Sequence, residues 1–470
     1  MHKLLYINTI GCQMNVYDSE RIVNNLISFG YETTPFVESA DLIITNTCTI
    51  REKAEQKAFS FLGRLSRLKQ KNPDLIIAVG GCVAQQQGRK ILKRMPHVDL
   101  VFGTHALGRL PQAIEKIERQ RCRIVDIQMT ESLDDDSTQP MAVKAEAVSK
   151  FVTIMRGCDN YCAYCVVPYV RGREASRNPD QIVTEIEQLV HGGVREVTLL
   201  GQNVNSYGKK EGLCTFAELL SRINDIEQLS RIRFTTSHPK DLSDDLINTF
   251  GRLDKLCHHL HLPIQSGSNR ILKRMNRKYT REVYLEKVAA LRASCPEISI
   301  TTDIIVGFPG ETSADVDDTL DLIRQMRYDS LFVFNYSDRP LAPSQKFIKK
   351  VPEKDKKARL QQVLQLQNSI TSEIHAEMVG ETVSVLVEGY SKRQQMEKTT
   401  DAPLQWSGRT SCNKIVNFVV GSTHKKGATD ITGETVRVKI EKALSHSLWG
   451  ILQANVSSSS DLKGDRSYAA

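Results

Sequence analysis

The chain has 470 residues, a formal net charge of +8, 40% hydrophobic and 25% charged residues. This composition is typical of a folded globular protein, and the length exceeds what one hydrophobic core supports, so we expect two or three domains. The N-terminus lacks the apolar segment of a signal peptide, and no stretch approaches the ~20 apolar residues that span a bilayer. We therefore expect a cytoplasmic protein without membrane contact. The positive charge fits an anionic partner such as RNA, and solubility explains it equally well.

Residues 1–126 alternate short β-branched runs with helical patterns. This rhythm predicts an α/β domain with a parallel sheet wound by helices. We expect strands at residues 4–7, 42–45, 75–79 and 98–101, and helices at 18–29, 51–69 and 85–94.

Three cysteines, Cys12, Cys48 and Cys82, each follow one of these predicted strands. We call them the N-terminal triad. The carboxyl ends of parallel strands form the ligand crevice of an open sheet, so cysteines far apart in sequence are expected to meet there. Free cysteines are often plain core residues. The Gly, Asn and Thr neighbours of these three place them in loops instead, which favours metal ligation.

An acidic, polar linker is predicted at residues 127–147, followed by a second domain at 148–378. Strands are expected at residues 151–155, 196–200, 231–235, 260–262, 299–305 and 330–334. Their alternation with helical stretches predicts a partial or full parallel (β/α) barrel, whose active site is built from the loops after the strands.

The loop after the first barrel strand contains Cys158, Cys162 and Cys165, in the spacing C-x-x-x-C-x-x-C. We call these the barrel triad. Disulfides are the weaker explanation in a chain without an export signal. A zinc site would need a fourth ligand near these three cysteines. The candidate histidines do not have the spacing of a zinc finger: His191, His258, His259 and His261. Each triad is one thiolate short of the four that normally hold a 4Fe-4S cluster, which leaves one iron open for chemistry.

Residues 379–453 change to a β pattern, with alternating runs at 382–389, 415–420 and 435–440. These predict a small antiparallel β-barrel. The Ser-rich residues 454–470 are expected to be a disordered tail.

The barrel triad resembles the signature of the radical S-adenosylmethionine (radical SAM) superfamily. The resemblance implies that SAM binds the open iron and is cleaved reductively to a 5′-deoxyadenosyl radical. It further implies that Tyr164 lies against the adenine, that Gln202 and Asn203 contact the SAM amino group, and that Ile305 and Gly307 contact the adenosine. A packing tyrosine and an ordinary turn glycine remain alternatives. Segments 237–239 and 261–267 also follow strands and are candidates for the cavity lining.

The whole arrangement, from residue 3 to about 454, resembles the methylthiotransferases. Gly408-Arg409-Thr410, Asn413 and residues 416–418 resemble a TRAM module, which implies RNA binding, with Arg409 and Lys414 as candidate phosphate contacts. Residues 11–15, 18–20 and 46–54 are most similar to the tRNA-2-methylthio-N(6)-dimethylallyladenosine synthases.

This resemblance implies a radical SAM transferase that attaches a methylthio group to carbon 2 of N(6)-dimethylallyladenosine at position 37 of tRNA, beside the anticodon. It implies two 4Fe-4S clusters and SAM, with the sulfur-donating cluster on the N-terminal triad. No catalytic residue is expected beyond the cluster ligands. The implied partners are a tRNA with isopentenylated adenosine 37, an electron donor such as flavodoxin or ferredoxin, and a sulfur or cluster carrier. We expect a monomer.

Two alternatives remain open. One is a methylthiotransferase for threonylcarbamoyl-adenosine in tRNA or for a ribosomal protein side chain. The other is a non-catalytic iron–sulfur RNA-binding protein or redox sensor. One segment departs from the family pattern: residues 338–342 read Asp-Arg-Pro-Leu-Ala where the family usually has Pro-Arg-Pro-Gly-Thr, which leaves the geometry of this loop open.

Overall fold

The computed structural model describes residues 3–49, 52–130, 147–392, 394, 404–420 and 430–453. Most of the predicted linker and all of the predicted tail lie outside these residues. The chain divides into two compact units, Met1–Gln367 and Asn368–Ala470, which are described separately. Within the described residues, no helix combines the length and apolar character needed to cross a membrane.

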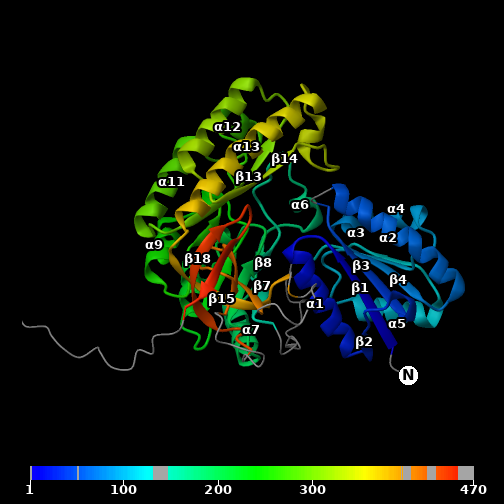
Figure 1. Ribbon diagram of the computed structural model, residues 1–470. Coiled ribbons are helices and arrows are strands. Elements are labelled where there is room, and N and C mark those ends of the chain that lie inside the picture. The colour runs from blue at the N-terminus through cyan, green and yellow to red at the C-terminus, as the bar shows by residue number, and fades with distance from the viewer. Residues whose placement is uncertain are drawn as a thin grey trace, which may run out of the picture. The chain divides into compact units, whose positions relative to one another are not determined.

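The first unit begins with a six-stranded sheet in the order β2-β1-β3-β4-β5-β6, and all its pairings are parallel. Helices cover both faces (Figure 1). The strands are β1 (Lys3–Ile10), β2 (Tyr31–Thr33), β3 (Leu42–Thr47), β4 (Ile76–Gly81), β5 (Leu100–Phe102) and β6 (Ile124–Asp126). The helices are α1 (Gln13–Ile27), α2 (Glu52–Lys71), α3 (Cys82–Gln87), α4 (Arg89–Arg94) and α5 (Leu110–Gln120).

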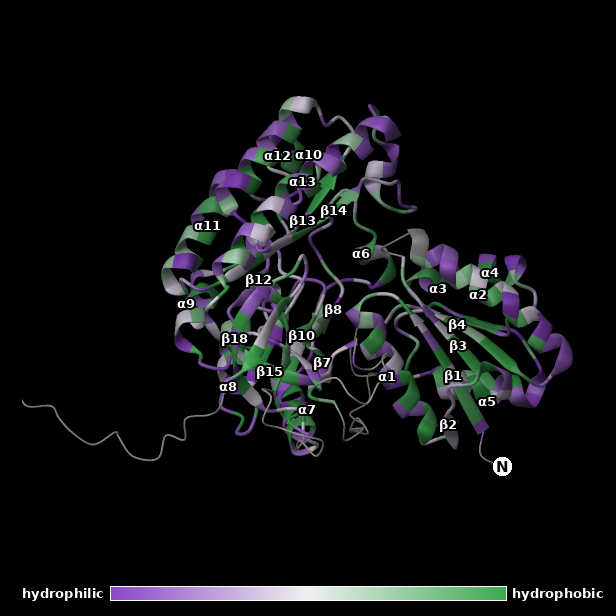
Figure 2. Cartoon of the chain, viewed as in Figure 1, coloured by the Kyte–Doolittle hydropathy of each residue, from purple (hydrophilic) through white to green (hydrophobic). Residues whose placement is uncertain are grey.

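The sheet separates two hydrophobic cores, because successive strand residues point to opposite faces. Ile44 and Ala78 pack with α1 and α5 on one face, whereas Ile43 and Ile77 pack with α2, α3 and α4 on the other. The central strands therefore have long apolar runs, such as Leu42–Ile44 of β3 and Ile76–Val79 of β4 (Figure 2), as expected of a parallel sheet covered on both sides. The predicted parallel α/β domain is confirmed.

One predicted helix is wrong in detail. The stretch 85–94 forms two helices, which Gly88 separates at φ +49° and ψ −125°. Glycine adopts this conformation at low cost, and other residues do not. The first of the two helices begins at Cys82 itself, so this cysteine is the first helical residue after β4.

The first unit continues with six parallel strands in two three-stranded sheets, β7-β10-β11 and β12-β13-β14. All six predicted barrel strands are present, and the predicted partial barrel is confirmed. They are β7 (Ser149–Thr153), β10 (Glu196–Leu200), β11 (Arg231–Phe234), β12 (His259–His261), β13 (Ser299–Val306) and β14 (Ser330–Asn335), with a small antiparallel pair β8 (Met155–Arg156) and β9 (Ala175–Ser176).

Helices follow most of these strands, and the last one, α13, crosses the boundary between the units. The helices are α6 (Val167–Val170), α7 (Pro179–His191), α8 (Phe216–Asn224), α9 (Asp244–Arg252), α10 (Asn269–Arg274), α11 (Arg281–Ser294), α12 (Ser313–Met326) and α13 (Glu353–Glu377). Short 3-10 turns occur at η1 (Val37–Ser39), η2 (Val204–Ser206), η3 (Pro239–Asp241) and η4 (Pro343–Lys346).

Helix α1 joins the six-stranded sheet to the barrel strands. The Met14 sulfur accepts a hydrogen bond from Thr153 Oγ1 at 3.7 Å. Further along α1, Asp18 pairs with Arg171 at 2.8 Å, and Glu20 pairs with Lys150 at 2.9 Å. With these contacts, both triads belong to a single compact unit, Met1–Gln367.

The second unit contains a closed barrel in the order β15-β16-β17-β19-β18. Its strands are β15 (Thr382–Tyr390), β16 (Gln405–Arg409), β17 (Ile415–Val419), β18 (Thr435–Ala443) and β19 (Leu448–Leu452). The predicted small β-barrel is confirmed, with one correction: β17 and β19 pair in parallel, so the barrel is not wholly antiparallel.

The sequence missed β16 and β19 because each contains a glycine that interrupts its β pattern. Both glycines are required by close backbone approach. A Cβ atom at Gly408 would lie 2.2 Å from the carbonyl oxygen of Leu386, and one at Gly450 would lie 2.2 Å from that of Lys439.

Candidate active site

The N-terminal triad lies at one edge of the six-stranded sheet. Ile10, Thr47 and Gly81 are partners in adjacent strands and end β1, β3 and β4 at the same level. The cysteines follow within two residues, so all three are at the carboxyl edge, as the sequence predicts. The structure thus brings together residues that are about 35 positions apart in the chain.

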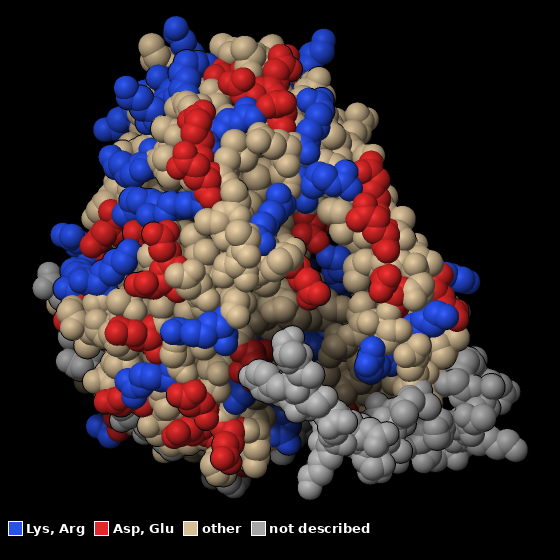
Figure 3. Space-filling view, turned by 90° about the vertical axis from the view of Figure 1, so that its left-hand side faces the viewer, with Lys and Arg blue, Asp and Glu red and all other residues tan. Residues whose placement is uncertain are grey.

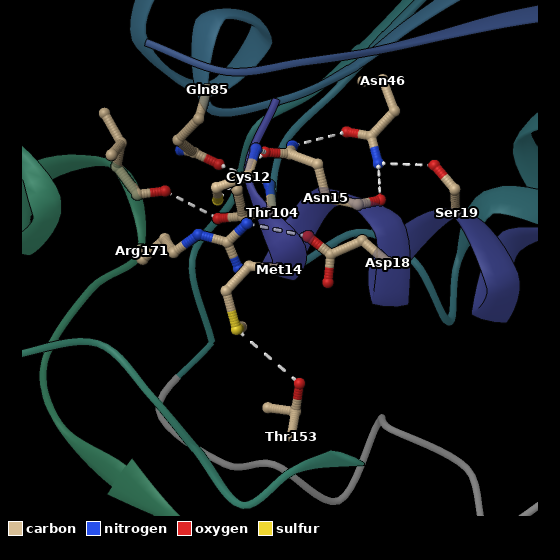
Figure 4. Close-up of polar contacts among 12 residues, drawn as sticks. Cys12, Met14, Asn15, Asp18, Ser19, Asn46, Gln85, Thr104, Thr153 and Arg171 are labelled. Atoms are coloured by element: carbon tan, nitrogen blue, oxygen red, sulfur yellow. Dashed lines mark hydrogen bonds and ion pairs between the residues drawn. The ribbon is translucent and has the colours of Figure 1, made fainter. Parts of the chain in front are cut away.

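A buried amide network holds this edge in place. Asn15 Oδ1 accepts from the backbone N–H of Cys12 at 3.2 Å, and its Nδ2 donates to Asn46 Oδ1 at 3.0 Å and to the Thr47 carbonyl at 3.2 Å. Asn46 in turn donates to the Asn15 carbonyl and to Ser19 Oγ (Figure 4). Both amides are buried, and this network ties the start of α1 to the end of β3.

The thiols of this edge have unequal acidity. A hydrogen bond with Cys48 lowers the pKa of Cys12 to about 6, and the charge of Arg171 lowers it further against the effect of burial. Burial raises the pKa of Cys82, and Arg171 opposes that rise by its charge and by a hydrogen bond. Cys12 caps α1 and Cys82 starts α3, so two thiols stand at helix N-termini, where negative charge is stabilised.

The barrel triad occupies the loop between β8 and α6. The backbone N–H of Cys158 donates to the Gly172 carbonyl at 3.3 Å, and Cys165 Sγ accepts from the Val167 N–H at 3.4 Å. Gly157 has φ +74°, and a Cβ there would lie 2.0 Å from the Arg173 carbonyl oxygen. Only glycine fits at this turn, which fixes the direction of the loop.

Burial makes two of the barrel thiols, those of Cys158 and Cys165, weak acids. It raises the pKa of Cys158 to about 11 and that of Cys165 to about 12. Metal binding requires thiolates, so positive charge must enter this site together with the loss of the thiol protons.

Arg277 supplies a positive charge next to this triad, although the sequence did not single it out. Its Nη1 donates to Cys162 Sγ at 3.3 Å, its Nε to Tyr279 Oη at 2.7 Å and its Nη2 to the Pro263 carbonyl at 2.8 Å. The side chain is buried, and no carboxylate of the described residues pairs with it. A buried cation without a counterion is costly, so this position fits an anionic cluster or ligand.

Three of the five residues expected to contact SAM lie beside the barrel-triad loop. Gln202 Oε1 accepts from the backbone N–H of Gly157, next to Cys158. Tyr164 and Ile305 pack against the same buried cluster around Phe308. The remaining two are held by acidic partners: Asn203 donates to Asp241 at 2.8 Å, and the Gly307 N–H donates to Glu311 at 2.6 Å.

Several buried polar atoms near the ends of the barrel strands have no hydrogen-bond partner in the described structure: Gln202 Nε2, Asn203 Oδ1, both amide atoms of Asn205, Ser237 Oγ, His238 Nε2 and Asn335 Oδ1. They come from the loops after β10 and β11 and from the end of β14. Buried polar atoms are normally paired. Donors and acceptors left open at one end of a barrel therefore fit a polar ligand such as SAM.

His238 illustrates how the protein prepares such a donor. Its Nδ1 accepts from the Lys240 N–H at 3.2 Å, so the proton of the neutral ring is on Nε2. Burial lowers the pKa of His238 to about 2, and the charges of Arg277 and Lys240 act in the same direction. The ring is thus a neutral N–H donor at physiological pH.

The histidines considered as zinc ligands have other partners. His191 Nδ1 contacts the Glu187 carbonyl in its own helix, and His261 Nδ1 contacts Thr301 Oγ1 at 3.0 Å. Among the described residues, no three His, Cys, Asp or Glu side chains are placed to bind one metal ion together. In a 4Fe-4S cluster each thiolate binds a different iron.

The segment that departs from the family pattern lies against the N-terminal triad. Gln86 of α3 donates to the Pro340 carbonyl at 3.1 Å, and Ala342 packs with Cys82, Val166 and Val170. Leu341 has φ +75°, a conformation that favours glycine. The loop thus has a glycine-like backbone although the glycine is replaced.

Comparison with known proteins identifies the family. The model of the uncharacterized protein family UPF0004 matches residues 4–103, and that of the radical SAM superfamily matches residues 152–323. The chain is 55% identical to the tRNA-2-methylthio-N(6)-dimethylallyladenosine synthase of Desulfosudis oleivorans over 449 residues, which cover 96% of both chains. It is 52% identical to that of Geobacter metallireducens, over 96% of this chain and 98% of the relative.

The chain belongs to the tRNA-2-methylthio-N(6)-dimethylallyladenosine synthase family. Among solved structures, it is similar to the radical SAM methyltransferase TsrM of Kitasatospora setae, with a TM-score of 0.55, 13% identity and coverage of 85% of this chain and 79% of the other. The cobalamin-dependent radical SAM enzyme OxsB gives a TM-score of 0.52 at 13% identity, over 78% and 56% of the two chains. These similarities support the radical SAM fold of this synthase family member.

Proposed function

We propose that this protein transfers a methylthio group to carbon 2 of N(6)-dimethylallyladenosine at position 37 of tRNA, giving 2-methylthio-N(6)-dimethylallyladenosine. Family membership over nearly the full chain carries the proposal. Two three-cysteine sites at strand ends of one compact unit support it. The target carbon has an unactivated C–H bond, which acid–base chemistry alone does not functionalise.

We assign one 4Fe-4S cluster to Cys12, Cys48 and Cys82, and a second to Cys158, Cys162 and Cys165. When bound, the clusters and SAM supply a 5′-deoxyadenosyl radical and a methylated sulfur. The contacts to SAM are assigned to the residues predicted from the sequence: Tyr164, Gln202, Asn203, Ile305 and Gly307. His238 adds a neutral donor, and Arg277 adds a buried positive charge, to the polar groups assigned to this site.

The chain's own residues hold these sites rigidly and away from water. The amide network of Asn15 and Asn46 fixes the position of Cys12, and the turn at Gly157 fixes that of Cys158. Preorganised donors in a buried site interact with a ligand more strongly than donors that water competes for. We assign no catalytic residue beyond the cluster ligands.

We assign tRNA binding to the C-terminal barrel, residues 379–453, as a TRAM module. Acidic and basic side chains are interspersed on the face shown in Figure 3. Arg409 pairs with Glu388 at 2.9 Å and with Asn413 at 3.2 Å, so it is a poorer phosphate contact than expected. Arg437 and Lys439, exposed at alternate positions of β18, are better candidates.

The remaining assignments follow from the family. We propose a cytoplasmic monomer with boundaries at residues 1–126, 148–378 and 379–453. It takes electrons from a donor such as flavodoxin or ferredoxin, and replacement sulfur from a sulfur or cluster carrier.

Incubation of the reconstituted protein with SAM, a reductant and defined tRNA tests the activity. With isopentenylated tRNA, nucleoside mass spectrometry is expected to detect the 2-methylthio product. Product only from threonylcarbamoylated tRNA would overturn the substrate assignment. If protein with both clusters intact does not cleave SAM reductively, the result would favour the alternative of a non-catalytic RNA-binding protein or redox sensor.

Iron analysis tests the two ligand sets separately. The wild-type protein is expected to hold about eight irons and eight labile sulfides per chain, because each cubane has four of each. Replacing Cys12, Cys48 and Cys82 by alanine should leave about four, and so should replacing Cys158, Cys162 and Cys165. Replacement of the unassigned Cys122, Cys257 and Cys295 should leave about eight. Four irons in the wild-type protein would contradict the proposal.

A further inference from the structure

Arg171 belongs to the barrel part of the chain, but it contributes to the N-terminal triad. It directly follows α6 and lies six residues after Cys165 in the sequence. The loop after β5 holds its backbone in place: Thr104 Oγ1 donates to the Val170 carbonyl at 2.7 Å, and His105 Nε2 contacts the Arg171 carbonyl at 3.0 Å. This clamp directs the side chain into the N-terminal site.

The guanidinium of Arg171 is buried, with 6% of the residue exposed. Its Nη2 forms an ion pair with Asp18 Oδ2 of α1 at 2.8 Å, and the two side chains are 7% and 12% exposed (Figure 4). Desolvation offsets much of the attraction in such a pair, so the pair alone is weak evidence of a stabilising role. A guanidinium also has five N–H donors, more than one carboxylate uses.

The same guanidinium enters the site from beside two of the three cysteines. Cys82 packs against Val170, the residue before Arg171, and Cys12 caps α1, the helix that carries Asp18. Three thiolates in a buried site carry negative charge that is costly unless nearby positive charge balances it. Arg171 therefore faces a group of anions, of which Asp18 is the one present at every stage.

We propose that Arg171 is the positive charge that balances the N-terminal triad when it holds its 4Fe-4S cluster; this rests on the ligand assignment proposed above. A buried cation beside a cluster stabilises the reduced, more negative form of that cluster and so raises its reduction potential. Asp18 orients the guanidinium and cancels part of its charge, so it lowers the potential. The cluster site of the N-terminal part is thus completed by a residue of the barrel part.

The test isolates the N-terminal cluster in the full-length chain. In a background with Cys158, Cys162 and Cys165 replaced by alanine, the potential of the remaining cluster is measured by redox titration with detection by electron paramagnetic resonance. Arg171→Gln is expected to lower the potential, and Arg171→Lys to lower it less. Asp18→Asn keeps a hydrogen-bond acceptor for Arg171 but removes the negative charge, and is expected to raise the potential.

The opposite shifts in reduction potential expected for Arg171→Gln and Asp18→Asn distinguish an electrostatic role of Arg171 from a structural one. If the ion pair only holds the fold, both substitutions lower the melting temperature and iron content together and leave the potential of the retained cluster unchanged, which overturns the proposal. If Arg171→Gln does not fold, Asp18→Asn alone decides, and a potential that is unchanged or lowered refutes it. Absence of iron from the background variant instead overturns the ligand assignment itself, and this inference with it.

Discussion

At the residue scale, His238 shows how far burial changes an ordinary side chain. Burial holds it neutral in the folded protein, with a pKa of about 2, whereas the unfolded chain binds a proton near pH 6.5. The folded state therefore has full stability above pH 6.5 and loses it progressively as the pH falls below 6.5. Between pH 7.5 and 5.5 this one residue is expected to cost about 1.4 kcal/mol.

The matched variant is His238→Asn, because an asparagine oxygen is able to accept from the Lys240 N–H in place of Nδ1. In urea denaturation of the cluster-free protein, the variant should lose about 1.4 kcal/mol less between pH 7.5 and 5.5 than the wild type. An equal loss in both proteins would show that His238 is already protonated, or exposed, in the fold.

Leu341 gives a second residue-scale prediction. It adopts φ +75° and is 52% exposed, so its side chain gains little from burial while its backbone bears the cost of a left-handed conformation. Leu341→Gly is expected to stabilise the protein by up to about 1 kcal/mol, seen as a higher Tm. Leu341→Ala retains the Cβ and should give no gain; equal effects of both substitutions would rule out a backbone cause.

At the scale of elements, the close approach of β3 and β4 positions two cysteines of the N-terminal triad. Gly81 has φ +89°, and a Cβ there would lie 2.3 Å from the Thr47 carbonyl oxygen. Gly81→Ala must therefore push the strands apart where Cys48 and Cys82 emerge. The expected result is loss of about four of the eight irons per chain, measured by iron analysis, with the barrel cluster retained.

Gly63 of α2 is the matched control for that substitution. Nothing lies within 4 Å of its Cβ position, and alanine in a helix interior is more favourable than glycine by about 1 kcal/mol. Gly63→Ala should therefore raise the Tm and keep all the iron. Full iron content in Gly81→Ala would mean that the strand ends tolerate the displacement.

The sequence predicted the elements that carry a strong periodic signal. The strands β1, β3, β4, β7, β10, β13 and β14 contain runs of apolar and β-branched residues, so their positions and the cysteines after them were predictable. Edge strands β2 (Tyr-Glu-Thr) and β6 (Ile-Val-Asp) have no apolar run longer than two residues. Arg171 and Arg277 were not predictable, because tertiary packing alone brings each one next to its thiols.

At the scale of the whole molecule, the two compact units should have separable roles. Arg437→Ala combined with Lys439→Ala removes two exposed cations from β18 of the second unit. If these two side chains contact phosphates, the affinity for tRNA should fall. In a plot of the logarithm of the binding constant against the logarithm of the salt concentration, the slope should become shallower by about 1 to 2. SAM cleavage without tRNA should be unchanged.

The control removes the same charge from the first unit, as Lys90→Ala with Lys93→Ala on the exposed side of α4. This pair should leave the affinity and its salt dependence near the wild-type values. Equal losses from both pairs would indicate non-specific attraction by net charge, and not recognition through the C-terminal barrel.

Helix α1 has a further consequence for how the first unit stays together. Met14, Asp18 and Glu20 contact the barrel part through a buried sulfur and two ion pairs, independently of the peptide that joins residues 130 and 147. A protease site engineered between those positions should therefore yield two fragments that still co-elute as one particle. The length and composition of this connection are then free to vary among relatives, whereas Asp18 and Glu20 of α1 and their partners Arg171 and Lys150 have to change together.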